Sequence, residues 1–186
     1  MLKHIRNTAA IAACAVAAAS TIAAIAASAS HGTNEAANES TNGDAPEFTG
    51  IDQWLNSEPL TLERLRGKVV LVDFWTYTCA NCINTLPAVK SWNQKYKDHG
   101  LVVIGVHTPE YPFERDTGNV KRAIERFGIT YPVAQDNRYA TWTAYSNRYW
   151  PAFYLIDKHG KVAYAHFGEG EYAQTETAIR NLLAQK

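Results

Sequence analysis

Two cysteines separated by two residues are the side chains of this sequence best suited to chemistry. They lie in the segment Cys79-Ala80-Asn81-Cys82, and the residues after it have helical spacing. This places Cys79 at a helix N-terminus, where unpaired backbone N–H groups and the helix dipole stabilise a thiolate and lower its pKa. Cys82 is then placed to attack a mixed disulfide formed at Cys79. The pattern predicts dithiol redox chemistry, with Cys79 as nucleophile and Cys82 as resolving thiol.

Two structural roles for the same cysteine pair are weaker alternatives. A zinc site needs two more ligands at similar spacing, and His107, His159 and His166 form no such pair. A structural disulfide that closes so short a loop would add little stability. The sequence therefore predicts redox chemistry with no metal site and no small-molecule cofactor.

An acidic residue interrupts an otherwise apolar run six positions before the first cysteine. Asp73 is expected to be buried beneath the dithiol, where desolvation raises its pKa and makes it a proton acceptor for Cys82. The alternative is a carboxylate at the strand end in contact with solvent. Three polar residues after the next apolar run are candidates for the rim of the site: His107, Glu110 and Glu114. The alternative for each is a solvated loop residue with no role in the chemistry.

The elements that must position these residues follow from hydrophobic periodicity. Residues 69–75 and 101–106 are near-continuous apolar runs, typical of strands covered on both faces. Residues 80–98 between them have helical spacing, and this strand–helix–strand order predicts a right-handed parallel unit. Further elements are predicted at 120–127 (helix), 131–134 (strand), 138–145 (helix), 152–156 and 162–167 (a hairpin) and 172–184 (helix). The fold class is therefore α/β, a mixed sheet covered by helices.

The N-terminus has the features of an export signal. Lys3 and Arg6 precede an uncharged, alanine-rich run, and Ala27-Ser28-Ala29 offers the small residues that a signal peptidase requires. We predict a signal peptide over residues 1–29 and export, to the periplasm or cell envelope of a bacterium. A retained membrane anchor and lipidation at Cys14 are the alternatives, and membrane attachment is expected only in those two cases.

The next segment, residues 30–46, contains no large apolar side chain. Such a stretch cannot bury enough surface to offset the entropy of ordering it, which predicts a flexible spacer. One folded domain is then expected over residues 47–186. The 186-residue chain has 18 basic and 18 acidic residues, so its composition gives no electrostatic reason to expect a nucleic-acid partner.

Several motifs of the chain, taken together, resemble those of a known protein family. Residues 69–75, then three residues and Cys-x-x-Cys, resemble thioredoxin-fold thiol–disulfide oxidoreductases. Pro87 falls where that family kinks its first helix, and Trp150-Pro151 falls at the family's cis-proline. Residues 62–68 are similar to the exported TlpA-type branch. The chain most resembles the thioredoxin-like domain of DipZ-type proteins in three segments: 74–79, 105–110 and 147–151.

This resemblance implies a thioredoxin-like fold with an N-terminal extension and protein disulfides as substrates. Because the predicted compartment is oxidising, a reductase there would need electrons from a membrane protein. It also implies a cis Trp150–Pro151 bond beside the dithiol, and a substrate-binding surface formed by Trp75, Trp150 and Pro151. Ala80-Asn81 replaces the Gly-Pro that is common between the cysteines of the family.

Two other functions use the same cysteines. A peroxiredoxin-like peroxidase needs Pro-x-x-x-Thr-x-x-Cys; Thr76 fits this pattern, but Val72 stands where the proline belongs. A copper- or haem-handling chaperone would use Cys79, Cys82 and a histidine as soft ligands. Thiol–disulfide exchange is the favoured prediction, and the other two are its alternatives.

Overall fold

The structure is a computed structural model that describes residues 43–186. The predicted signal peptide, Cys14 and most of the predicted spacer lie outside the described residues. Among residues 43–186, no helix combines the length and the apolar character needed to cross a membrane.

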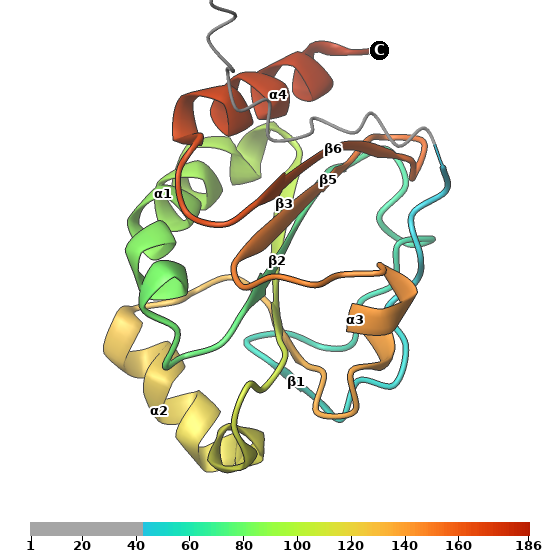
Figure 1. Cartoon of the computed structure of the whole chain (residues 1–186). Helices are drawn as coiled ribbons and strands as arrows, with labels where there is room; N and C mark the ends of the chain where they lie inside the picture. The colour runs from blue at the N-terminus through green and yellow to red at the C-terminus, as the bar shows by residue number, and fades with distance from the viewer. Residues whose placement is uncertain (1–42) are drawn as a thin grey trace, which may run out of the picture. The chain divides into compact units, whose positions relative to one another are not determined.

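A mixed sheet forms the centre of the described part, as predicted (Figure 1). Its strands are β1 (Gln53–Leu55), β2 (Val69–Trp75), β3 (Leu101–His107), β4 (Val133–Gln135), β5 (Ala152–Ile156) and β6 (Val162–Phe167). Their order is β1-β4-β3-β2-β5-β6. Strands β2, β3 and β4 are parallel, whereas β5 runs antiparallel to β2 and β6 antiparallel to β5. Strand β2, which leads to the cysteines, is therefore paired on both sides.

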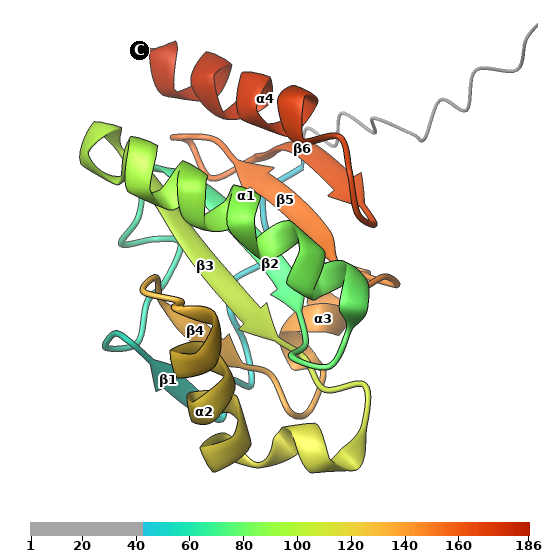
Figure 2. The same ribbon diagram turned by 90° about the vertical axis from the view of Figure 1, so that its left-hand side faces the viewer.

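Helices cover both faces of this sheet. They are α1 (Ala80–Tyr96), α2 (Thr117–Phe127), α3 (Ala140–Ala144) and α4 (Tyr172–Ala184), with short 3-10 turns η1 (Lys97–His99) and η2 (Pro112–Arg115). Helices α1, α2 and α4 lie on one face, and α3 lies on the other (Figures 1 and 2). The predicted helix over 80–98 is thus α1 continued by η1, and Gly100 ends it with a φ of 101°.

The alternation of side chains along β2 sorts its residues between two cores. Leu71 and Trp75 pack with Cys82 in the core under α1, whereas Val72 and Phe74 belong to the core on the α3 face. Because successive side chains in a strand point to opposite faces, Asp73 points the same way as Leu71 and Trp75. Its carboxyl group is therefore directed to the face that carries the cysteines.

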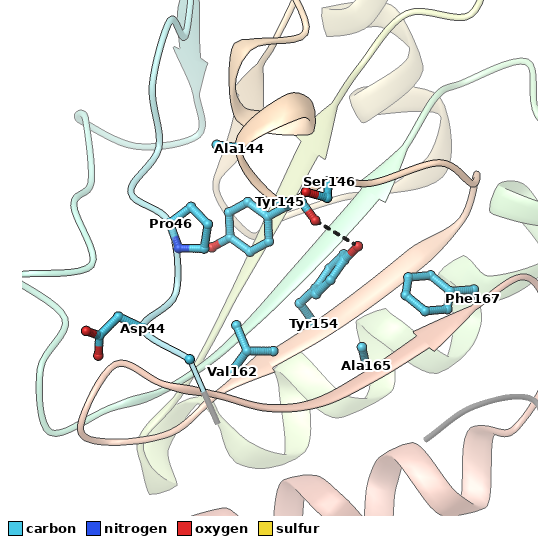
Figure 3. Close-up of a pocket in the computed structure, with 10 residues that line it drawn as sticks. Asp44, Pro46, Ala144, Tyr145, Ser146, Tyr154, Val162, Ala165 and Phe167 are labelled. Atoms are coloured by element: carbon cyan, nitrogen blue, oxygen red, sulfur yellow. Dashed lines mark hydrogen bonds between the residues drawn. The ribbon is translucent and has the colours of Figure 1, made fainter. Parts of the chain in front are cut away.

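The last residues of the predicted spacer contact the sheet. The Val162 N–H donates to the Gly43 carbonyl at 3.0 Å, and the Ala45 N–H donates to the Gly160 carbonyl at 2.9 Å. A pocket of about 320 Å³ lies between this segment, the end of α3 and β6 (Figure 3). Inside it the Tyr154 hydroxyl lies 3.5 Å from the Tyr145 carbonyl. These two tyrosines belong to the α3-face core, so the pocket lies across the sheet from Cys82.

Candidate active site

Cys79 is the N-cap of α1, and its sulfur accepts a hydrogen bond from a backbone N–H in the first turn of this helix. Its Sγ accepts the backbone N–H of Cys82 at 3.2 Å. Cys79 is half-buried and Cys82 is fully buried, and both are free thiols. Hydrogen bonds from the Cys82 side chain and backbone outweigh partial burial and lower the pKa of Cys79 to about 7. Burial, with the hydrogen bond to Cys79, raises the pKa of Cys82. The two thiols therefore differ in both access and acidity, as the helix-terminus argument predicts.

Asp73 is fully buried, as predicted. The alternative, a carboxylate at the strand end in contact with solvent, is therefore wrong. Neither carboxyl oxygen has a hydrogen-bond partner among the described residues. Burial, and next the charge of Cys79, raise the pKa of Asp73 to about 8. The charge of Asp73 in turn raises the pKa of Cys82. Asp73 is thus coupled electrostatically to both thiols.

Gly105 makes room for two aromatic rings beside this carboxyl group. It is the cross-strand partner of Asp73 in β3, and an added Cβ would lie 2.9 Å from Trp75 Nε1 and 3.2 Å from Tyr131 Cε2. The Tyr131 hydroxyl and Trp75 Nε1 are buried, and neither has a hydrogen-bond partner among residues 43–186. The residues that pack at Gly105, the cross-strand partner of Asp73, therefore include two with buried polar atoms that have no partner among residues 43–186. Because Trp75 is fully buried, its side chain offers no surface to a substrate in this conformation.

The loop before Cys79 is held by a buried carboxylate. Glu114 accepts the Thr78 hydroxyl at 2.5 Å and the backbone N–H groups of Glu110 and Tyr111 at 2.6 and 2.9 Å. Burial raises the pKa of Glu114, but these hydrogen bonds outweigh it and the net shift is downward. Glu114 therefore remains an anion that fastens the loop before the nucleophile to η2. Glu114 is therefore not at the rim of the site, the position for which its sequence makes it a candidate, and no recognisable motif marks this network.

His107 is also buried rather than at the rim. It is the last residue of β3, and the ring of Tyr77 stacks on it with centroids 5.5 Å apart. Its Nε2 lies 3.3 Å from the Thr76 hydroxyl. Burial lowers the pKa of His107 to about 4, so the ring is neutral at physiological pH. Of the three predicted rim residues, Glu110 alone is exposed.

Glu114→Ala is expected to lower the free energy of unfolding by about 2–4 kcal/mol, because three donors lose a buried acceptor. The matched control is Glu110→Ala, since Glu110 is an exposed acid in the same loop. Urea unfolding followed by tryptophan fluorescence measures both variants. Equal midpoints for the two variants would show that the Glu114 network contributes no stability.

The Trp150–Pro151 bond is cis, as predicted. Pro151 is buried, and its carbonyl accepts the N–H of Gly168 at 2.8 Å. Trp150 is half-buried, and its indole N–H donates to the Thr108 carbonyl at 3.0 Å. The pairing of Phe74 with Ala152 brings this segment to the end of β2 that leads to Cys79.

Comparison with known proteins agrees with this fold and site. The Redoxin family matches residues 41–183. Protein DipZ of Mycobacterium bovis is 58% identical over 144 residues, which cover 76% of this chain and 21% of that protein. Thiol-disulfide oxidoreductase YkuV of Bacillus subtilis is 35% identical over 75% of this chain and 94% of its own length. A solution structure of a thioredoxin-like protein in the oxidized form has a TM-score of 0.71 and 34% identity, and covers 77% of this chain and 97% of its own.

The fold and the helix-terminal dithiol are those of the thioredoxin-fold thiol–disulfide oxidoreductases of the DipZ and TlpA type, which confirms the predicted resemblance. The chain belongs to the Redoxin family. It spans about a fifth of the length of the DipZ protein that it matches.

Proposed function

We propose that this chain is an exported oxidoreductase that exchanges disulfides with protein substrates, with Cys79 as nucleophile and Cys82 as resolving thiol. The observation that carries the proposal is the contrast between the thiols. Cys79 is half-exposed with a lowered pKa, and Cys82 is buried with a raised one. A relative that spans most of this chain is named a thiol-disulfide oxidoreductase, which supports the same chemistry.

The reaction has two displacement steps. The Cys79 thiolate attacks one sulfur of the substrate disulfide, and the other substrate sulfur leaves as a thiolate. Cys82 then loses its proton and attacks Cys79 Sγ, which releases the second substrate thiolate. The substrate disulfide gains two electrons, and the chain is left with a Cys79–Cys82 disulfide.

Asp73 is the proposed acceptor of the Cys82 proton. Its pKa of about 8 leaves a minor ionised fraction at neutral pH while Cys79 is a thiolate. Once Cys79 is bonded to the substrate it carries no charge, so its contribution to the raised pKa disappears. The ionised fraction of Asp73 therefore increases at the step that needs a base.

The proposed substrate-binding surface is the backbone of Trp150, which the buried Pro151 holds in place. It adjoins the start of β5, whose pairing with β2 brings it to the cysteine end of the sheet. Tyr149, immediately before it, is 55% exposed. An extended substrate segment could add its backbone beside this segment, in the manner of strand addition.

Export and electron supply complete the proposal. The predicted signal peptide would place the domain in the periplasm or cell envelope, where a dithiol is oxidised by its surroundings. Continued reduction of substrates then requires two electrons per turnover from a membrane protein. Measurement of the Cys79–Cys82 potential would give the direction of flow: about −270 mV is typical of a reductant and about −120 mV of an oxidant.

Alkylation by iodoacetamide tests the assignment of the two thiols. In the full chain with Cys14→Ser, Cys79 is expected to react at least about tenfold faster than Cys82 at neutral pH, because the thiolate is the reactive form. The rate at Cys79 should rise with pH through a midpoint of about 7. Peptide mapping by mass spectrometry measures both sites, and faster labelling of Cys82 would reverse the assignment. Urea-unfolded protein is the control, since both thiols should then react at similar rates.

A further inference from the structure

A groove with a basic lining lies beside the loop that leads to Cys79. It has a volume of about 290 Å³, and we call it the arginine groove. Its principal lining residues are Tyr77, Phe113, Asn119, Arg122, Arg126 and Phe127. Two of its lining side chains are arginines, and no acidic side chain lines it.

One lining residue of the arginine groove, Tyr77, belongs to the loop that leads to Cys79. Tyr77 precedes Cys79 by two residues, and its hydroxyl donates to the Phe113 carbonyl at 3.2 Å. Since consecutive Cα atoms are about 3.8 Å apart, a substrate cysteine at Cys79 would place its near neighbours in sequence within reach of the groove. Phe113 is 55% exposed and stacks on Tyr111, so the rim also offers apolar contact.

Each of the two guanidinium groups has a neutral side chain as its neighbour. Arg122 donates to the Asn119 side chain, and the guanidinium of Arg126 lies 5.3 Å from the centroid of the Phe127 ring. Within residues 43–186 neither arginine forms an ion pair. The nearby carboxylate of Asp116 is used as the N-cap of α2, where it accepts the Asn119 N–H at 2.7 Å. Both arginines therefore retain donors for an incoming anion.

We propose that the arginine groove binds an acidic side chain of the partner polypeptide, close in sequence to the cysteine that Cys79 attacks. The inference rests on the proposed function, because it takes the partner to be a protein disulfide. Guanidinium groups match a carboxylate with charge-assisted hydrogen bonds, and the aromatic walls accept the neighbouring apolar atoms of the same segment. The groove thus selects among disulfide partners by charge.

A set of disulfide-bonded peptides tests this selection. The peptides differ only in the place of one glutamate among the positions that flank the cysteine, and each has a glutamine counterpart. The full chain with Cys14→Ser is expected to reduce at least one glutamate peptide roughly tenfold faster in kcat/KM than its counterpart at low salt, with the preference falling as salt rises. Arg122→Gln and Arg126→Gln together should remove the preference. Arg180→Gln, an exposed arginine on α4, is the matched control and should retain it.

The charge-reversed variant Arg122→Glu with Arg126→Glu provides a gain of function. It should prefer peptides in which lysine replaces the glutamate, a result that a misfolded protein cannot give. Reduction of the uncharged hydroxyethyl disulfide should be equal in all variants. Loss of that reaction in the parent protein would contradict the proposed function itself. Normal hydroxyethyl disulfide reduction with equal rates on glutamate and glutamine peptides at every position would overturn the groove assignment alone.

Discussion

Replacing Cys79 by serine is expected to abolish disulfide exchange, with a loss on the order of a thousandfold or more, because no thiolate remains to attack the substrate. Replacing Cys82 by serine should instead stop the reaction after the first step. Serine keeps a hydroxyl donor near Cys79, so the nucleophile stays activated while resolution is impossible. Non-reducing electrophoresis with a disulfide-bonded protein substrate should show an accumulated mixed disulfide for Cys82→Ser and none for Cys79→Ser.

The background for both variants is Cys14→Ser, so that no third thiol takes part. Thiol-specific release of the substrate by a reductant is the control for a true mixed disulfide. A trapped adduct in Cys79→Ser and none in Cys82→Ser would mean that the buried thiol is the nucleophile. That result would refute the argument from the helix terminus.

The second large effect is expected for Asp73→Asn, which keeps the shape of the side chain and removes the proposed proton acceptor. Resolution by Cys82 should slow by roughly a hundredfold, a size typical of a general base, while the first attack by Cys79 stays nearly unchanged. Stopped-flow tryptophan fluorescence separates the two phases. In the parent protein the slow phase should accelerate with pH as Asp73 ionises, and this dependence should be absent in Asp73→Asn. An unchanged slow phase would exclude Asp73 as the base.

The same substitution has an expected effect on stability. The pKa of Asp73 is about 8 in the folded chain against a reference value of 3.8, so the folded state holds a proton that the unfolded state has lost between these values. This contribution to stability is fully present below about pH 4 and is lost as pH rises through about 8. Asp73→Asn should therefore gain stability relative to the parent as pH rises, on the order of 4 kcal/mol across that range. Urea midpoints measured from pH 4 to pH 8 should diverge, and parallel curves would contradict the raised pKa.

The part of the site predicted from sequence depends on local patterns. The apolar run 69–75 and the helical spacing after Cys79 place one cysteine at a helix end and the other one turn inside, and the structure has both there. The acid that interrupts the same run is predicted to be buried, and Asp73 is fully buried. These inferences need only the period of a strand or a helix, which the sequence displays directly.

The remainder depends on contacts between segments distant in sequence. Glu114 is buried because a hydroxyl group 36 residues earlier and two local N–H groups surround its carboxylate. Strand β1 has three residues and pairs with β4 about 80 positions later, so it has no pattern long enough to predict it. Trp75 is buried because it packs in the core under α1. The sequence alone does not distinguish such a core tryptophan from one that binds substrate at the surface.

The central claim is that the Cys79–Cys82 pair transfers two electrons to a protein disulfide. Its most direct test is mass spectrometry of the reduced full chain with Cys14→Ser after reaction with one equivalent of a disulfide-bonded protein. The chain is expected to lose two hydrogens, with one peptide cross-link that joins Cys79 to Cys82, and the substrate is expected to carry two new thiols. Two unreacted thiols in the chain, beside an intact substrate disulfide, would contradict it.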